Sequence, residues 1–320
     1  MTIGMTICAI ISYLNNIFPF LQSVVLSCCL SQFVLSCCLE FKGTQGQLMS
    51  SIQVHILDRP MDALKILVPA LLYLLQNTLL YVALSNLTAP IFQVTYQAKL
   101  VTTAIVSVAM LSRKYSFQQW LCLVAISLGV AIVVLGEKSG HNSTSESGSM
   151  NLVVGLVAVT TACFSSALAG VYFEYVIKKP AAAGQSVPAP SLWMRNMQLA
   201  FFSVCVAMGQ GLFQSAKDPV PAGQGYFHGF TGWVWVLVWL QAGGGLLVAA
   251  VIKYADNVLK GMATGVSVVT STACSTILFG TPLTGQFMVG AAMILVAVYG
   301  FSNPIPLPST KSTRAFALPR

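Results

Sequence analysis

Charged residues are scarce in this sequence. Asp, Glu, Lys and Arg make up 8% of its 320 residues, whereas hydrophobic residues make up 56%. The mean hydropathy is +0.78. Soluble globular proteins carry about 25% charged residues, so this composition excludes an ordinary aqueous domain and is typical of a polytopic membrane protein. The lipid bilayer is therefore the first partner that the sequence predicts.

Metal ligands and acid–base pairs are also scarce. The three histidines, His55, His141 and His228, lie in connectors, and no apolar stretch carries a carboxylate cluster or a metal-ligand spacing. The nine cysteines lie in apolar stretches and include no CxxC, so we interpret them as small core residues rather than zinc ligands or disulfides. We therefore expect no catalytic residues, no metal and no cofactor, and a lipid-modifying enzyme is the least favoured class.

Most of the positive charge lies in connectors and the C-terminal tail. A net charge of +8 is also found in nucleic-acid-binding proteins, but membrane topology explains it more simply here, and we expect no nucleic acid partner. The positive-inside rule places basic ends, and with them the C-terminus, in the cytosol. The basic residues recur after every other predicted span, at Arg113, Lys114, Lys178, Lys179, Lys253, Lys311, Arg314 and Arg320.

Long apolar runs are what this sequence has in abundance. A helix needs about 20 apolar residues to cross about 30 Å of hydrocarbon. The first 39 residues are uncharged, but Asn15, Asn16 and Pro19 interrupt them, and at about 1.5 Å per residue they are short for two spans and a turn. The other predicted spans are 64–84, 90–111, 117–136, 151–176, 191–213, 232–252, 258–279 and 284–301. An all-α protein with nine or ten spans is expected, and the symmetry described next favours ten.

The polar connector GEKSGHNSTSESGSM divides these spans into halves. If the N-terminal region supplies two helices, five spans precede the connector and five follow, and an odd number inverts the second half in the membrane. The sequon at Asn142 fits a glycosylated lumenal loop, although a chance sequon is as good an interpretation. The predicted parts are an atypical N-terminal region (1–63), the rest of the first repeat (64–136), a lumenal connector (137–150), the second five-helix repeat (151–301) and a cytosolic tail (302–320).

Two lysines lie inside predicted spans, at matching places of the two halves. Lys99 and Lys260 each fall on the fourth helix of their half, and an inverted repeat brings such a pair to facing positions near the bilayer midplane. An ammonium at membrane depth costs about 2.5 kcal/mol or more, so we interpret the pair as anion receptors. The alternative is that each side chain extends to an interface, which is weaker for Lys99 than for Lys260, because Lys260 lies only a few residues inside its helix.

Polar residues surround Lys99. Hydroxyl and amide groups occur within two helical turns of Lys99, and Asn77 lies on the preceding span. Such groups can bind a base or a ribose, but they can equally tie helices together, which is their usual role in membranes. The nearby polar residues are Gln93, Thr95, Tyr96, Gln97, Thr102 and Thr103.

The sequence contains four diagnostic blocks, which are LLQNTLLYVALSNLTAPIFQVTYQAKLVTTAI, GVYFEYVIK, LWMRNMQLAFF and VIKYADNVLKGMATGVSVV. In this order they resemble the Golgi nucleotide-sugar transporters for UDP-galactose, UDP-N-acetylglucosamine and CMP-sialic acid. The resemblance runs from about residue 60 to about residue 300 and departs most before residue 50, where only LEFKG remains of a helix end with Glu40 and Lys42. It implies a ten-helix drug/metabolite-transporter fold in the Golgi membrane rather than the endoplasmic reticulum.

The resemblance also implies substrate-binding residues. It places Lys99 and Lys260 against the phosphates and Phe92 on the pyrimidine ring. Ala200 and Ala249 stand where the CMP-sialic acid pattern has a tyrosine and a serine, which looks more like the UDP-sugar branches. The remaining residues that it places near the nucleotide are Asn77, Tyr96, Thr103, Asn196 and Gln198.

The expected function is therefore exchange across a membrane. The resemblance implies a pyrimidine nucleotide-sugar antiporter, with a UDP-sugar and UMP as its small-molecule partners. A CMP-sialic acid/CMP exchanger, or a small-metabolite exporter of the same superfold, stays open because fold alone does not decide substrate. Association with further copies of the chain also stays open.

Overall fold

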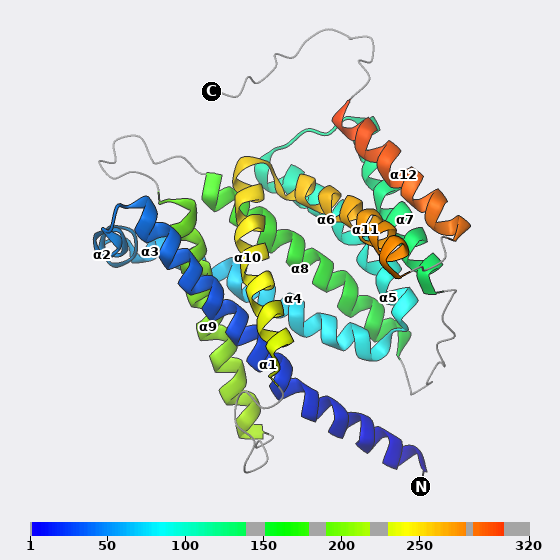
Figure 1. Cartoon of the computed structure of the whole chain (residues 1–320), viewed down its shortest axis with the longest axis horizontal. Coiled ribbons are helices and arrows are strands. Elements are labelled where there is room, and N and C mark those ends of the chain that lie inside the picture. The colour runs from blue at the N-terminus through cyan, green and yellow to red at the C-terminus, as the bar shows by residue number, and fades with distance from the viewer. Residues whose placement is uncertain (1, 139–150, 179–189, 218–229, 280–283, 304–320) are drawn as a thin grey trace. The chain divides into compact units, whose positions relative to one another are not determined.

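A computed structural model describes residues 2–138, 151–178, 190–217, 230–279 and 284–303. These residues form helices and no strand, which confirms the all-α expectation (Figure 1). The sequon at Asn142 and most of the predicted tail lie outside the described residues. The helices are α1 (Thr2–Gly43), α2 (Leu48–Ile52), the π-helical turn η1 (Gln53–Leu57), α3 (Pro60–Leu64), α4 (Leu67–Asn86), α5 (Ala89–Tyr96), α6 (Ala98–Leu111), α7 (Phe117–Lys138), α8 (Leu152–Lys178), α9 (Leu192–Lys217), α10 (Gly232–Tyr254), α11 (Asn257–Phe279) and α12 (Gly285–Ser302).

The predicted spans are helices of spanning length, and the N-terminal region differs from the favoured count. Residues 2–43 form the single helix α1, with no turn at Asn15, Asn16 or Pro19, where the favoured count needs two helices. Among the described residues, seven segments are both long and apolar enough to cross a membrane. Helices α9 and α11 are long enough but more polar, which is expected of helices that bury hydrogen-bonding side chains against other protein.

Helix packing divides the chain into two compact units, each built from both halves of the sequence. One unit holds residues 1–112 and 143–263, and the other holds residues 113–142 and 264–320. Helix α11 begins in the first unit and ends in the second. The predicted connector at residues 137–150 separates two sequence repeats, and that division stays a prediction.

Helix α8 is the central helix of the first unit. It packs against α4, α5, α6 and α10, and small residues allow the close approach (Figure 1). At Gly155 an added Cβ would lie 2.5 Å from Cγ of Leu87, and the Ser165 hydroxyl donates to the Leu72 carbonyl at 2.9 Å. In lipid there is no hydrophobic driving force that brings two helices together. Transmembrane helices therefore associate through close packing of small residues and through hydroxyl hydrogen bonds of this kind.

Helix α1 joins this unit through a polar contact. The Asn196 amide of α9 donates to the Ser36 hydroxyl at 2.7 Å and accepts from the Gln32 amide at 3.2 Å. Gln32 also lies against Gly245 of α10, where an added Cβ would lie 3.0 Å from the Gln32 amide. The N-terminal region, although atypical in sequence, is therefore packed as a transmembrane helix against α9 and α10.

The second unit is a tightly packed helix pair. Helices α7 and α12 run against one another, and their backbones meet at two glycines. An added Cβ at Gly290 would lie 2.7 Å from the carbonyl oxygen of Gly129 and 3.1 Å from the backbone nitrogen of Val133. The Gln118 amide donates to the Gly300 carbonyl at 2.8 Å and fixes the far end of the pair.

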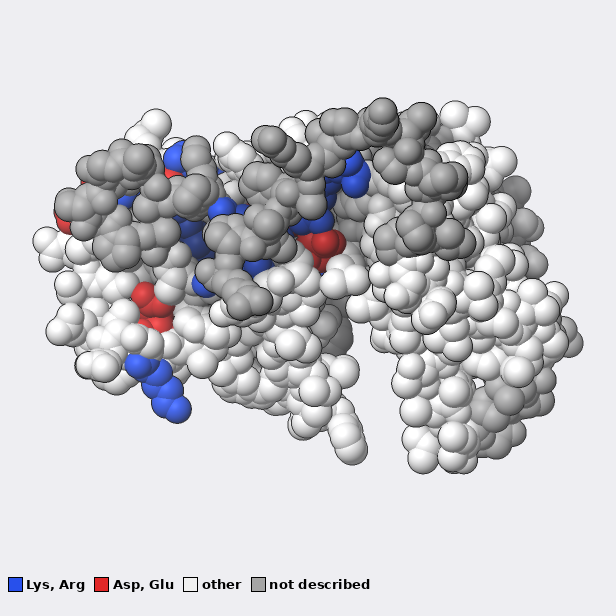
Figure 2. Space-filling model, turned by 90° about the horizontal axis from the view of Figure 1, so that it is seen from above, with Lys and Arg blue, Asp and Glu red and all other residues white. Residues whose placement is uncertain are grey.

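Charged side chains gather on the face of the molecule that Figure 2 shows from above. Within the first unit, the connector between α1 and α4 forms ion pairs. The Asp62 carboxylate of this connector pairs with Arg195 of α9 at 2.5 Å and with Lys65 at 2.9 Å. Arg195 also donates to Gln198 at 3.1 Å. Arg195 and Lys65 are therefore partners of an acidic group rather than only solvated charges.

Candidate anion-binding site

The helix that carries Lys99 is broken immediately before it. Helix α5 ends at Tyr96, Gln97 separates the two segments, and α6 begins at Ala98. Around the break, the amides of Gln97 and Leu100 donate to carbonyls three residues back, at 3.2 and 3.3 Å, in place of the α-helical spacing of four. Lys99 is therefore the second residue of α6, where the positive end of the helix dipole adds to its own charge.

Two aromatic rings and the ammonium of Lys99 form one face of this segment. Nζ of Lys99 donates to the Tyr96 hydroxyl at 3.1 Å and lies 5.2 Å from the centre of the Tyr96 ring. The Tyr96 and Phe92 rings are stacked, with centroids 5.6 Å apart and planes at 11°. All three side chains are half-buried, so they are held in place while part of each surface stays accessible. A cation beside a flat aromatic surface can bind a phosphate and stack a planar base.

Lys260 also lies on the first turn of a helix. It is the fourth residue of α11 and is half-buried. Its neighbour Gly261 lies against Leu100, the residue after Lys99, where an added Cβ would be 2.7 Å from Cδ1 of Leu100. Lys99 and Lys260 thus lie in one region of the first unit, each close to the start of a helix.

Not every predicted residue belongs to this cluster. The Gln198 amide accepts from Arg195 at 3.1 Å and donates to the His55 carbonyl at 3.3 Å, and Asn196 binds Ser36 and Gln32 of α1. Both amides therefore already use their donor and acceptor ends in holding α9 against its neighbours. The resemblance places both residues near the nucleotide, whereas in this conformation their amides hold helices together, which is what polar residues in membranes usually do.

The remaining predicted residues lie on α6 and α4. The Thr103 hydroxyl is buried and donates to the Lys99 carbonyl at 2.7 Å, so it supports the backbone of the lysine rather than presenting a free hydroxyl. Asn77 is exposed on α4, and the neighbouring Gln76 is the buried residue there. The structure therefore brings together Phe92, Tyr96, Lys99 and Lys260, and it gives Thr103 a supporting contact.

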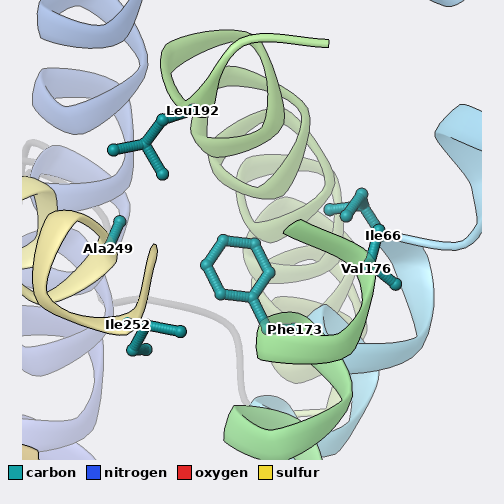
Figure 3. Close-up of a cluster of buried hydrophobic side chains, with 6 residues drawn as sticks. All are labelled: Ile66, Phe173, Val176, Leu192, Ala249 and Ile252. Atoms are coloured by element: carbon teal, nitrogen blue, oxygen red, sulfur yellow. The ribbon is translucent and has the colours of Figure 1, made fainter. Parts of the chain in front are cut away.

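The two alanines that suggest a UDP-sugar branch are both buried. Ala200 and Ala249 are each 2% exposed. Ala249 packs in an apolar cluster formed by the ends of α8, α9 and α10 together with the residue before α4, as Figure 3 shows. A hydroxyl at position 249 would therefore enter an apolar contact in this conformation, at a cost that a methyl group avoids.

Sequence reasoning missed the role of Glu174. Its carboxylate is fully buried, and it accepts from Lys178 at 2.8 Å and from the backbone N–H of Asn257 at 3.0 Å. In the sequence, Glu174 and Lys178 have the spacing of a solvated ion pair at a helix end. No local signal indicates the contact with Asn257, because the two residues are far apart in the chain.

Comparison with known proteins decides the family. A family model described as "Nucleotide-sugar transporter" matches residues 2–302. The chain belongs to the nucleotide-sugar transporter family. Relatives of this nucleotide-sugar transporter include a human UDP-N-acetylglucosamine transporter, 45% identical over 264 residues (81% of this chain and 77% of the relative). A dog UDP-N-acetylglucosamine transporter is 44% identical over the same shares, and a mouse UDP-galactose translocator is 45% identical over 263 residues (82% and 64%).

These comparisons confirm the resemblance seen in the four sequence blocks. The family is one of transporters rather than enzymes, and its multi-pass helices agree with the described fold. The family model also includes the atypical N-terminus, because its match begins at residue 2. The packing of α1 against α9 and α10 is consistent with this extent.

Proposed function

We propose that this nucleotide-sugar transporter is a pyrimidine antiporter of the Golgi membrane, which imports a UDP-sugar into the lumen in exchange for UMP by alternating access. The observation that carries the proposal is the pair Lys99 and Lys260 on the first turns of α6 and α11. A nucleoside monophosphate brings about two negative charges near pH 7, and a nucleotide sugar brings a similar number. Two ammonium groups therefore neutralise either ligand in a site from which water is largely excluded.

The aromatic pair supplies the second half of the proposed site. The Phe92 ring, stacked on Tyr96, offers a flat surface for a pyrimidine, and Tyr96 in turn orients Lys99 through its hydroxyl. Thr103 supports the lysine backbone, and Asn77 is an accessible amide for the ribose or the base. In this assignment Asn196 and Gln198 contribute by holding α9 in place.

The same charges explain coupling between entry and exit. In an unloaded site the two like charges repel each other, and we propose that this repulsion raises the barrier for the empty carrier to change conformation. Either anion removes that barrier. The carrier therefore reorients loaded in both directions, and this is the behaviour of an exchanger.

The names of the relatives favour uridine nucleotides as the transported substrates. The compared proteins are named UDP-N-acetylglucosamine transporter and UDP-galactose translocator. In this chain Ala200 and Ala249 lack the hydroxyls that the CMP-sialic acid pattern carries. We therefore propose UDP-N-acetylglucosamine or UDP-galactose as the substrate.

Uptake into proteoliposomes tests this function. Purified protein is reconstituted with UMP, CMP or no nucleotide inside, and labelled nucleotide sugars are added outside. Uptake of a UDP-sugar that requires internal UMP would support the proposal. Uptake without any internal nucleotide would point to a uniporter or a small-metabolite exporter, and uptake of CMP-sialic acid alone would identify the sialic acid exchanger.

Competition between nucleotides is expected to favour UMP over CMP. Uridine and cytidine differ at one edge of the ring, and a buried site that lacks a hydrogen-bonding partner for one of them discriminates strongly. With UDP-sugar uptake as the readout, UMP should inhibit at lower concentration than CMP in the same preparation. A tenfold advantage for CMP, equal to about 1.4 kcal/mol, would move this chain to the sialic acid branch.

The proposed orientation predicts which tags antibodies reach. Because basic connectors favour the cytosol, a tag after Arg320 should be labelled when only the plasma membrane is permeabilised. A tag inserted near Ser147 should stay hidden until the Golgi membrane is opened as well. Labelling in the reverse order would contradict both the cytosolic C-terminus and the lumenal position of Asn142.

A further inference from the structure

The C-terminal end of α8 contacts the corner at which α10 turns into α11. The Glu174 carboxylate, which is 0% exposed, accepts from the backbone N–H of Asn257, the first residue of α11. Lys178, paired with the same carboxylate at 2.8 Å, also donates to the carbonyl of Ala255. The Glu174–Lys178 ion pair on α8 therefore binds the backbone carbonyl of Ala255 on one side of the corner and the backbone N–H of Asn257 on the other.

The first N–H groups of a helix have no partner within the helix, and a carboxylate is the strongest acceptor that a side chain offers them. Helix α11 has one such acceptor just before its first residue: Asp256 accepts from the N–H of Leu259 at 2.6 Å. Glu174 provides the other from a different helix. The start of α11 is thus held to α8 as well as capped locally, and Lys260 lies three residues after Asn257, on the same turn.

Packing leaves little freedom for this contact to shift. At Gly170, one turn before Glu174, an added Cβ would lie 2.4 Å from Nδ2 of Asn257. On the other side, Phe173 and Val176 of α8 pack with Ile252 of α10 in the apolar cluster of Figure 3. Both helices that meet at the corner are therefore held against the same end of α8.

Helix α8 supports the other lysine too. The Cys163 thiol donates to the Tyr96 carbonyl at 3.7 Å, at the break before Lys99, and Val171 packs against Val106 of α6. The two cations are thus carried by different helices, but both helices start against α8.

We infer that Glu174 is a positioning residue for Lys260: by binding the N–H of Asn257 it sets the direction of the first turn of α11, and so the affinity for the anion. This inference rests on the proposed function. Glu174 has no exposed surface, so it acts through α11 and not by touching the ligand.

The test is equilibrium binding of UMP to the purified full-length protein. The Kd is measured from the shift in melting temperature as UMP is titrated up to millimolar concentration. We expect Glu174→Ala to raise the Kd on the order of tenfold, because a displaced ammonium loses most of its close attraction to phosphate. Glu174→Gln should raise it less, since the amide oxygen can still accept from Asn257. The matched control is Thr284→Ala, which removes the side-chain cap of α12, where the Thr284 hydroxyl accepts from the N–H of Phe287 at 3.2 Å. It should lower stability without changing the Kd.

A double-mutant cycle separates positioning from a general loss of structure. If Glu174 acts through Lys260, adding Glu174→Ala to Lys260→Ala should leave the already weakened Kd unchanged. A second loss of the same size in that background, or wild-type affinity in the Glu174→Ala protein, would overturn the inference. A wild-type chain that binds neither UMP nor CMP would instead overturn the proposed function, and the premise of this inference with it.

Discussion

Lys99→Ala or Lys260→Ala is expected to abolish exchange while leaving a folded protein. Each substitution removes one of the two cations that face the phosphates, and an ion pair at 4 Å is worth about 4 kcal/mol at an effective dielectric constant of about 20. The rate at low substrate concentration should therefore fall by about two to three orders of magnitude. Folding should survive because a charged side chain at membrane depth costs free energy rather than stabilising the protein.

Further variants make this expectation specific. Lys99→Arg should also exchange poorly, because a planar guanidinium does not replace a compact ammonium and the contact with the Tyr96 hydroxyl depends on that shape. Lys114→Ala is the control, since Lys114 is exposed in the connector before α7. Uptake by UMP-loaded proteoliposomes measures all four proteins. Near wild-type exchange by both alanine variants would show that the two lysines do not form the anion site.

Gly290→Ala should strongly destabilise the pair α7 and α12. The new Cβ would meet the backbone of Gly129 and Val133 at 2.7–3.1 Å, and backbone atoms cannot move aside as the end of a side chain can. Overpacking of this kind costs about 1–3 kcal/mol, and the helices can relieve it only by separating. We expect a melting temperature several degrees lower, measured by fluorescence-detected size exclusion after heating in detergent, together with a lower folded yield.

The matched substitution is Gly244→Ala on α10. An added Cβ there meets nothing within 4 Å, so the change keeps the chemistry and removes the clash. Alanine in a helix is favoured over glycine by about 0.4–1 kcal/mol when the space is open, so this variant should melt at or above the wild-type temperature. Equal melting temperatures for the two alanine variants would contradict the close contact at Gly290.

Much of the site could be predicted from sequence because its strongest signals are local. A lysine inside an apolar run is costly wherever the run packs, so Lys99 and Lys260 indicate function before any contact is known. Phe92, Tyr96 and Lys99 lie three or four residues apart, and helical geometry alone brings such residues together on one face. The break at Gln97 carries no comparable sequence signal, and it became visible only in the structure.

The sequence by itself determined the class of protein, its spanning segments and the two cations, because hydrophobicity, helix length and the cost of a buried charge are properties of short stretches of chain. The tertiary structure decided the rest. It made residues 2–43 a single helix, turned Asn196 and Gln198 toward helix packing, and placed Glu174 against the start of α11. Each of these outcomes depends on a partner, or on the lack of a turn, that no local pattern encodes. A buried amide or carboxylate must find a hydrogen-bonding partner somewhere, but only the packed helices determine which one it meets.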